Sequence, residues 1–200
     1  MTRPDLAFAY SELNKYVQFP VKLHMSAAEH VLRYLRGTYE KGILFSRGVK
    51  HANLLWGWVD TDWDGDTDTH RSHTGFVLTF NGGPISWKSR RQDSVALSTS
   101  DTEYMVATDG GKEVVYMRDI LQDFGFTQTG PTNLFEDNLT AVVMSINPVR
   151  RKYSRHIRRH YVRELALPGL VKLIPLGTHD MVADALTKNC QLRLSHVTVR

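Results

Sequence analysis

The chain has 200 residues, of which 42% are hydrophobic and 23% charged, and its formal net charge is +4. This composition is typical of a soluble globular protein, and the length allows one sizeable domain with extra pieces or two small domains. The single cysteine, Cys190, excludes an intramolecular disulfide and a cysteine-rich zinc site. No apolar run reaches the roughly 20 residues of a membrane span, and the N-terminus lacks the apolar core of a secretory signal. We therefore expect an intracellular protein.

Two helices are predicted at the start of the chain. Apolar residues recur at helical spacing from Pro4 to Tyr16, and a second apolar stripe runs from Leu23 to Leu35, with Gly37 where a helix would end. Two helices alone bury too little surface to be stable. This segment must therefore pack either on the rest of the chain or on a missing partner.

The pattern changes to strands near residue 54. We predict strands over Leu54–Trp63, Thr74–Phe80 and Ile85–Lys88. The last two are separated by a turn that contains Asn81 and Gly82, which favours an antiparallel hairpin.

The second half of the chain alternates helices and strands. Inside its long first helix, Gly110 and Gly111 each cost roughly 1 kcal/mol against alanine, so we expect that a break or kink can occur there. The predicted elements are a helix over Ser98–Phe124, a strand over Asn133–Phe135, a helix over Leu139–Ile146, a strand over Leu170–Leu176 and a helix over Met181–Lys188.

The first predicted strand ends in a cluster of carboxylates: Asp60, Asp62, Asp64 and Asp66. Repulsion and desolvation oppose the packing of several carboxylates together, so such a cluster either binds a cation or lies in solvent. Side chains alternate along a strand, which puts Asp60, Asp62 and Asp64 on one face. Spacing alone cannot choose among these three.

Three further carboxylates are placed where they could join this cluster. Asp137 ends the fourth strand, Glu103 lies in the first turns of the long helix, and Asp184 lies in the last helix. Acids at the ends of adjacent strands and on the helices packed over them can converge on one point. Such an arrangement suits two divalent cations about 4 Å apart in phosphodiester hydrolysis. All-oxygen ligation favours Mg²⁺ or Mn²⁺ over zinc.

A strongly basic run lies between residues 150 and 163. We interpret it as a contact for a nucleic-acid backbone, because its charge is nearly all of one sign; the alternative is a solvated helix face. The residues that we assign to nucleic-acid binding are Arg150, Arg151, Lys152, Arg155, Arg158 and Arg159.

Several short motifs occur in a fixed order along the chain. They are Val59-Asp60-Thr61-Asp62-Trp63, Arg71-Ser72-His73-Thr74-Gly75, Ile85-Ser86-Trp87-Lys88-Ser89, the run from Val95 to Tyr104, Asp137-Asn138, His156-Ile157 and Ala183-Asp184-Ala185-Leu186-Thr187-Lys188. In this combination the sequence resembles the ribonuclease H domain of copia-type (Ty1/copia) retrotransposon Pol polyproteins. Residues Thr2 to Gly42 resemble the end of the reverse transcriptase region that precedes this domain.

The resemblance implies an α/β, ribonuclease H-like fold, with a mixed five-stranded sheet flanked by helices and a short helical N-terminal extension. The sheet would have three antiparallel strands and two parallel ones. We expect residues 1–46 to be the helical tail of the reverse transcriptase or connection region, and residues 54–190 to be the ribonuclease H-like domain.

The resemblance also implies cleavage of the RNA strand of RNA–DNA hybrids with two Mg²⁺ ions, for which Mn²⁺ can substitute. The implied metal ligands are Asp60, Glu103, Asp137 and Asp184, and the motif favours Asp60 over Asp62. Our hypothesis is that Asp60 bridges both metals. Glu103 and Asp137 would hold the metal on the leaving-group side, and Asp184 would help to hold the metal that activates water. The expected partners are the hybrid and the reverse transcriptase portion of the same polyprotein, in the cytoplasm within a virus-like particle or in the nucleus.

The sequence departs from the family pattern at several positions. Arg158 stands where Asp is usual, Asp101 where Glu is usual, and Asn189 where Pro is usual. No departure removes a metal ligand. Together they favour, as one alternative, a catalytically silent nucleic-acid-binding remnant; a second alternative is a structural module that keeps the fold without its activity. His179 lies in the loop before Asp184, where a ribonuclease H histidine assists product release, but the alignment there is too loose to assign its role.

Overall fold

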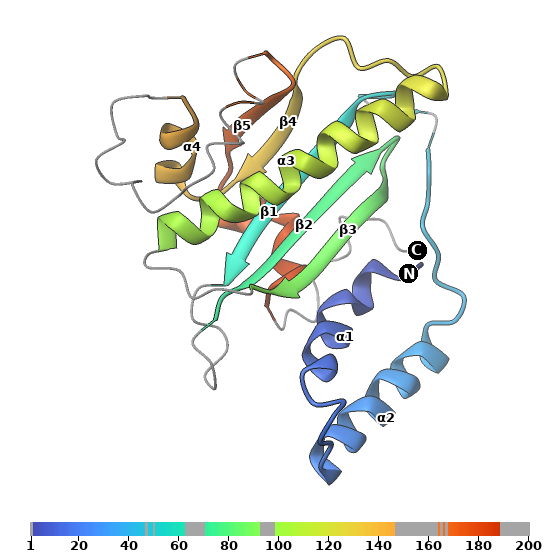
Figure 1. Cartoon of the computed structure of the whole chain (residues 1–200). Helices are drawn as coiled ribbons and strands as arrows, with labels where there is room; N and C mark the ends of the chain where they lie inside the picture. Colours follow the sequence, from blue (N-terminus) through green and yellow to red (C-terminus); the bar gives the residue numbers. More distant parts are fainter. Residues whose placement is uncertain are drawn as a thin grey trace.

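The computed structural model describes residues 2–46, 48–49, 51–62, 71–92, 99–146, 164, 166 and 168–188. Its centre is a five-stranded mixed sheet (Figure 1) in the order β3-β2-β1-β4-β5. The pairs β1–β2 and β2–β3 are antiparallel, whereas β1–β4 and β4–β5 are parallel. The strands are β1 (Leu55–Asp62), β2 (His73–Phe80), β3 (Gly83–Arg91), β4 (Thr132–Glu136) and β5 (Val171–Pro175). The predicted α/β architecture, a mixed five-stranded sheet flanked by helices with three antiparallel strands and two parallel ones, is confirmed.

The β2–β3 hairpin closes through the turn that the sequence predicts. Phe80 pairs with Gly83, and the two residues between them, Asn81 and Gly82, have φ angles of 50° and 80°. Two successive positive φ angles define the turn whose twist matches that of the flanking strands, and Asn-Gly is the pair that adopts it at least cost.

The long helix α3 (Thr99–Asp123) crosses one face of the sheet without a break (Figure 1). Gly110 explains why glycine stands inside it: a Cβ atom there would lie 2.7 Å from Cγ1 of Val59. The glycine therefore permits a close approach of helix and sheet, and the packing offsets its low helix propensity. The main apolar core lies in this layer and includes Val59, Tyr104 and Leu134.

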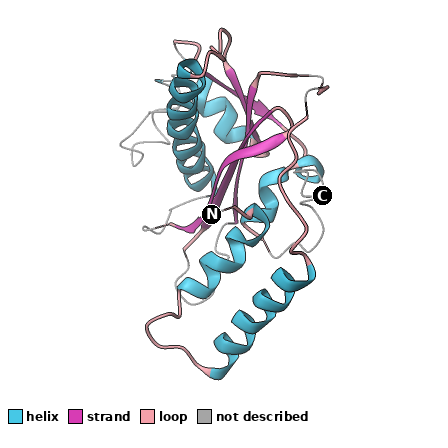
Figure 2. Ribbon diagram, turned by 90° about the vertical axis from the view of Figure 1, so that its right-hand side faces the viewer, coloured by secondary structure: helices cyan, strands magenta, loops and turns pink. Residues whose placement is uncertain are grey.

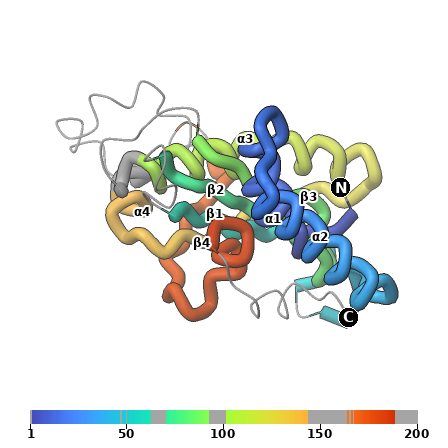
Figure 3. The backbone as a smooth tube through the Cα atoms, turned by 90° about the horizontal axis from the view of Figure 1, so that it is seen from below, coloured from blue at the N-terminus to red at the C-terminus, as the bar shows by residue number. Residues whose placement is uncertain are grey.

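The opposite face of the sheet is covered by α1 (Ala7–Asn14), with its 3-10 entry η1 (Pro4–Leu6), and by the segment after β5 (Figure 2). Ala7 is 1% exposed and packs in a second small cluster with Val77 and Leu186. Seen from below (Figure 3), α1 lies toward β3, while α4 (Leu139–Ile146) lies at the other side, near β4.

The second N-terminal helix, α2 (Lys22–Gly37), behaves differently from α1. It contains no buried residue, and Leu23 and Leu32 are 75% and 64% exposed. It projects away from the sheet (Figure 1) and is tied to η1 by polar contacts, among them the Tyr34 hydroxyl, which donates to Asp5 at 2.9 Å. Of the two alternatives for the N-terminal segment, packing on the rest of the chain holds for α1, whereas the apolar stripe of α2 stays exposed.

The last predicted helix is wrong in type. In place of an α-helix over 181–188, the chain forms one short 3-10 helix, η4 (Val182–Leu186). Another 3-10 helix, η3 (Thr178–Asp180), precedes it, and the extended backbone of Met181 separates the two. The side chains of Met181 and Leu186 are both almost fully buried. Burial at both ends holds the segment against the sheet in the tighter helix, which is common in short pieces.

No helix among the residues described above is both long and apolar enough to cross a membrane.

Candidate metal centre

The site lies where β1 and β4 stop pairing. The two strands are paired only from Trp56 to Trp58 and from Asn133 to Phe135. Asp60 lies two residues beyond this pairing on β1, and Asp137 lies two residues beyond it, just after β4 ends. The carboxyl ends of two adjacent parallel strands therefore place both acids beside the same gap, as is usual for sites in open α/β sheets.

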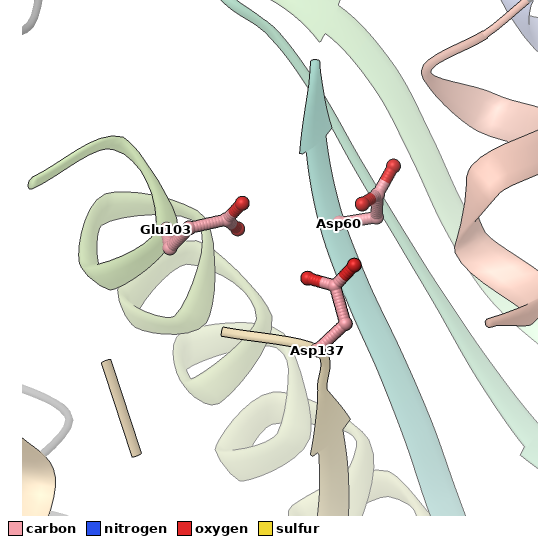
Figure 4. Close-up of side chains that lie close together, drawn as sticks. All are labelled: Asp60, Glu103 and Asp137. Atoms are coloured by element: carbon pink, nitrogen blue, oxygen red, sulfur yellow. The ribbon is translucent and has the colours of Figure 1, made fainter. Parts of the chain in front are cut away.

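Asp60 and Glu103 approach this gap from opposite faces of the sheet. Val59 packs toward α3, so alternation along the strand directs Asp60 to the other face, where it meets η4. Glu103 projects from the first turns of α3. Figure 4 shows the side chains of Asp60, Glu103 and Asp137 turned toward one another, and one carboxylate oxygen of each lies within 4.8 Å of the others.

These three carboxylates fit a divalent cation. Asp60 and Glu103 are 1% and 7% exposed, while Asp137 is only partly buried, so the group has an open side. Burial and the neighbouring carboxyl of Glu136 both oppose the ionisation of Glu103. A cation bound at Glu103 would offset this cost. The donors are all carboxylate oxygens, which suit Mg²⁺ or Mn²⁺.

The surroundings oppose ionisation of Asp60. Burial raises the pKa of its carboxyl to about 6, with smaller contributions in the same direction from Asp184 and Asp137. Lys188 and the hydroxyl of Thr187 act in the opposite direction and limit the rise. A cation bound at this carboxylate would therefore relieve an existing electrostatic cost.

Glu136 is a neighbour that the sequence reasoning missed. It is the last residue of β4 and is fully buried, on the inward face shared by Thr132 and Leu134. Burial, followed by the charge of Glu136, raises the pKa of Glu103 well above its usual range, and burial likewise raises the pKa of Glu136. Alternation along β4 could have shown that this acid points inward.

The fourth expected ligand, Asp184, lies in η4 and is 2% exposed, but it is outside the three-carboxylate group. Lys188 lies between Asp184 and Asp60: its Nζ is 2.9 Å from Oδ1 of Asp184 and 3.6 Å from Oδ2 of Asp60. The Thr187 hydroxyl donates a hydrogen bond to the same Oδ2 of Asp60. The sequence contained a signal for this pair, because Asp184 and Lys188 are four residues apart.

The segment that carries Asp184 is connected to α1 by polar contacts. Oε1 of Glu12 lies 3.3 Å from Nδ1 of His73, and Nε2 of His73 lies 2.8 Å from Oγ of Ser89. The Ser89 hydroxyl then donates to the backbone carbonyl of Leu186 at 2.6 Å. Through these contacts on β2 and β3, helix α1 is linked to the segment that carries Asp184.

The remaining predicted residues divide into three sets. Asp62 ends β1 and is not part of the carboxylate group, and His179 is exposed on η3. Asn138, next to Asp137, has a structural role: its Oδ1 accepts from the backbone N–H of Thr140 at 2.9 Å and caps α4. Asp64, Asp66 and the basic residues Arg150, Arg151, Lys152, Arg155, Arg158 and Arg159 lie outside the described residues.

Solved structures with a similar arrangement include that of LC11-RNase H1 in complex with an RNA/DNA hybrid. The similarity covers 66% of this chain and 93% of that one, with 13% identity and a TM-score of 0.47. No protein-family profile matches the chain.

Relatives by sequence include the retrovirus-related Pol polyproteins of transposon TNT 1-94 from Nicotiana tabacum and of transposon RE2 from Arabidopsis thaliana. They are 37% and 34% identical over 94% of this chain, which spans 14% and 13% of their own length. A third relative, the secreted RxLR effector protein 161 of Plasmopara viticola, is 40% identical over 58% of this chain and 81% of its own length. Because the Pol polyproteins match almost the whole sequence, the chain is homologous to a short segment of the Pol polyproteins of Ty1/copia-type retrotransposons.

Proposed function

We propose that this chain is a metal-dependent endonuclease that hydrolyses the RNA strand of RNA–DNA hybrids during retrotransposon reverse transcription. The observation that carries the proposal is the convergence of Asp60, Glu103 and Asp137, from three separate elements, to within 4.8 Å. The similarity to Pol polyproteins supports the proposed substrate, since the sequence resemblance is to their ribonuclease H domain.

Each carboxylate has a defined task in this proposal. Asp60 and Glu103 are the buried ligands, and the Thr187 hydroxyl fixes the orientation of Asp60. Asp137 is on the open side, and the hydroxyl of Thr178 lies 3.4 Å from its Oδ2. A divalent cation held by these oxygens would polarise the scissile phosphate and lower the pKa of a bound water. Asp184 is the proposed fourth ligand.

The proposed partners are based on the charge of the basic run and on the similarity to Pol polyproteins. The basic residues between 150 and 163 are proposed to contact the phosphate backbone of the hybrid, so binding should weaken steeply as salt is raised. The reverse transcriptase portion of the same polyprotein is the proposed protein partner. The division into residues 1–46 and 54–190 stays a prediction.

The proposal is tested by cleavage of a hybrid whose two strands carry different labels, with Mg²⁺, Mn²⁺ or EDTA. We expect cutting of the RNA strand only, in the presence of metal, and loss of cutting in Asp60→Asn. The matched control is Asp123→Asn, which changes an exposed acid at the far end of α3. Hybrid binding without cutting by the wild-type chain would contradict the proposal and favour the silent remnant.

A further inference from the structure

Lys188 brings a positive charge into the carboxylate site. Its ammonium lies 2.9 Å from Asp184 and 3.6 Å from Asp60, whose side chains are 3% and 1% exposed. The Lys188 side chain itself is 35% exposed, so it enters the site from the surface. Two buried carboxylates therefore share one cation that belongs to the protein.

The backbone fixes Lys188 in this place. Its N–H donates to the carbonyl of Asp184 at 2.9 Å, and the N–H of Thr187 donates to the same carbonyl at 3.2 Å. The turn after η4 thus carries both the hydroxyl and the ammonium that contact Asp60. Burial alone would lower the pKa of Lys188, but Asp60 and Asp184 raise it above its usual range, so the side chain stays charged.

Lys188 contacts Asp60 from the C-terminal segment that also carries Asp184. Figure 4 shows Glu103 and Asp137 on one side of Asp60 and the ribbon of the C-terminal part of the chain on the other. A second divalent cation ligated by Asp60 and Asp184 would need the space and the oxygen atoms that the ammonium now uses. The ammonium and a second cation would both be positively charged, and like charges this close together in a buried site repel strongly.

We propose that Lys188 is a built-in cation that takes the place of a second metal ion between Asp60 and Asp184. The resting site then binds one divalent ion tightly, at Asp60, Glu103 and Asp137. A second ion binds only after the ammonium leaves. This inference rests on the proposed function, because it assumes that the three-carboxylate group binds metal.

A purely structural ion pair would have a different consequence. Removal of Lys188 would then lower the stability of the protein without changing how it binds metal. Metal affinity is therefore the measurement that separates the two roles, and it does not depend on activity.

The test is a titration of the full chain with Mn²⁺, followed by calorimetry and by electron paramagnetic resonance of free Mn²⁺. The wild type should show one tight site and a second site at least about tenfold weaker. Lys188→Met, which keeps the length but removes the charge, should strengthen the second site about tenfold. Lys188→Arg should retain the wild-type pattern, and so should Lys172→Met, which removes an exposed lysine of β5.

Two sites of equal affinity in the wild type would overturn the inference, even if the Lys188→Met chain fails to fold. An unchanged second site in folded Lys188→Met would also overturn it and leave the proposed function intact. Absence of any Mn²⁺ binding by the wild type would instead overturn the proposed metal centre, and this inference with it.

Discussion

Asp60 stands between two carboxylate groups whose charge is balanced in different ways. On one side, Glu103 and Asp137 each bring a carboxylate oxygen to within 4.8 Å of Asp60, and burial beside Glu136 opposes the ionisation of Glu103. On the other side, Asp184 shares Lys188 with Asp60. Our proposal is that the first side binds a cation from solution, whereas the ammonium of Lys188 balances the charge of the second side.

The largest expected effect separates Asp60 from its neighbour Asp62, which alternation alone could not distinguish. Asp60→Asn should reduce hybrid cleavage by about 10³-fold, the order expected when a main electrostatic contact to the reacting group is lost. Asp62→Asn should stay close to the wild type, because Asp62 lies outside the three-carboxylate group. Single-turnover cleavage rates measure both. A larger loss in Asp62→Asn would reverse the assignment.

The two sides of Asp60 should also differ in metal affinity. Glu103→Gln should weaken the tight Mn²⁺ site by at least about 10- to 100-fold, because changes in the groups around a metal ligand already have this effect and Glu103 is itself a proposed ligand. Asp184→Asn should affect that site less, because Asp184 faces Lys188. Calorimetric titration of both variants gives the comparison. Equal weakening by the two substitutions would show that the four acids form a single, undivided site.

Stability without metal should decrease as pH rises from 5 to 8. The pKa of Asp60 is raised to about 6, and those of Glu103 and Glu136 are raised as well, so the folded state holds more protons than the unfolded state across this range. Stability falls with pH wherever the folded state binds the extra protons. Bound Mg²⁺ should reduce this loss, since it favours the charged carboxylates.

Thermal unfolding at pH 5 and pH 8, in EDTA and in Mg²⁺, measures this effect, which we expect to be several degrees. The pKa values of Asp5 and Glu12 are lowered by their partners, so their contributions change below this range. Glu136→Gln should give a smaller dependence on pH. A melting temperature in EDTA that rises from pH 5 to pH 8 would contradict the account.

A smaller effect is expected from the contacts that support η4. Ser89→Ala removes the hydrogen bond to the carbonyl of Leu186 and should cost about 1 kcal/mol of unfolding free energy. It should also bring the two Mn²⁺ affinities closer together, because Lys188 is then held less firmly. Ser86→Ala is the control on the same strand, where the hydroxyl contacts Glu113. Urea unfolding and Mn²⁺ titration report the two effects, and an unchanged ratio of affinities in Ser89→Ala would show that this contact does not position Lys188.

Local patterns predicted most of the fold. Alternation and turn residues located the strands and the hairpin at Asn81 and Gly82, because these depend on neighbouring residues alone. The glycine pair in α3 was harder to interpret, since the contact of Gly110 with Val59 is distant in sequence. The same limit applies to the N-terminal helices: both are amphipathic, but only the three-dimensional arrangement shows that α1 packs and α2 remains exposed.

The sequence predicts those residues of the candidate site that belong to recognisable motifs. The sequence indicates Asp60, Glu103 and Asp137, and the family motif favours Asp60 over Asp62. The spacing of residues alone cannot make this choice, because both side chains lie on the same face of β1. Glu136 and Lys188 were missed for a related reason. Alternation along β4 and the four-residue spacing of Asp184 and Lys188 were local signals, but the approach of Glu136 to Glu103 and of Lys188 to Asp60 joins separate elements.

The most direct test of the central claim is to locate the metal itself. Crystals of the full chain soaked in Mn²⁺ would be measured near the manganese absorption edge. The account predicts the strongest anomalous peak among Asp60, Glu103 and Asp137, with Lys188 still in contact with Asp184. A strongest peak between Asp60 and Asp184, or none at the three carboxylates, would contradict it.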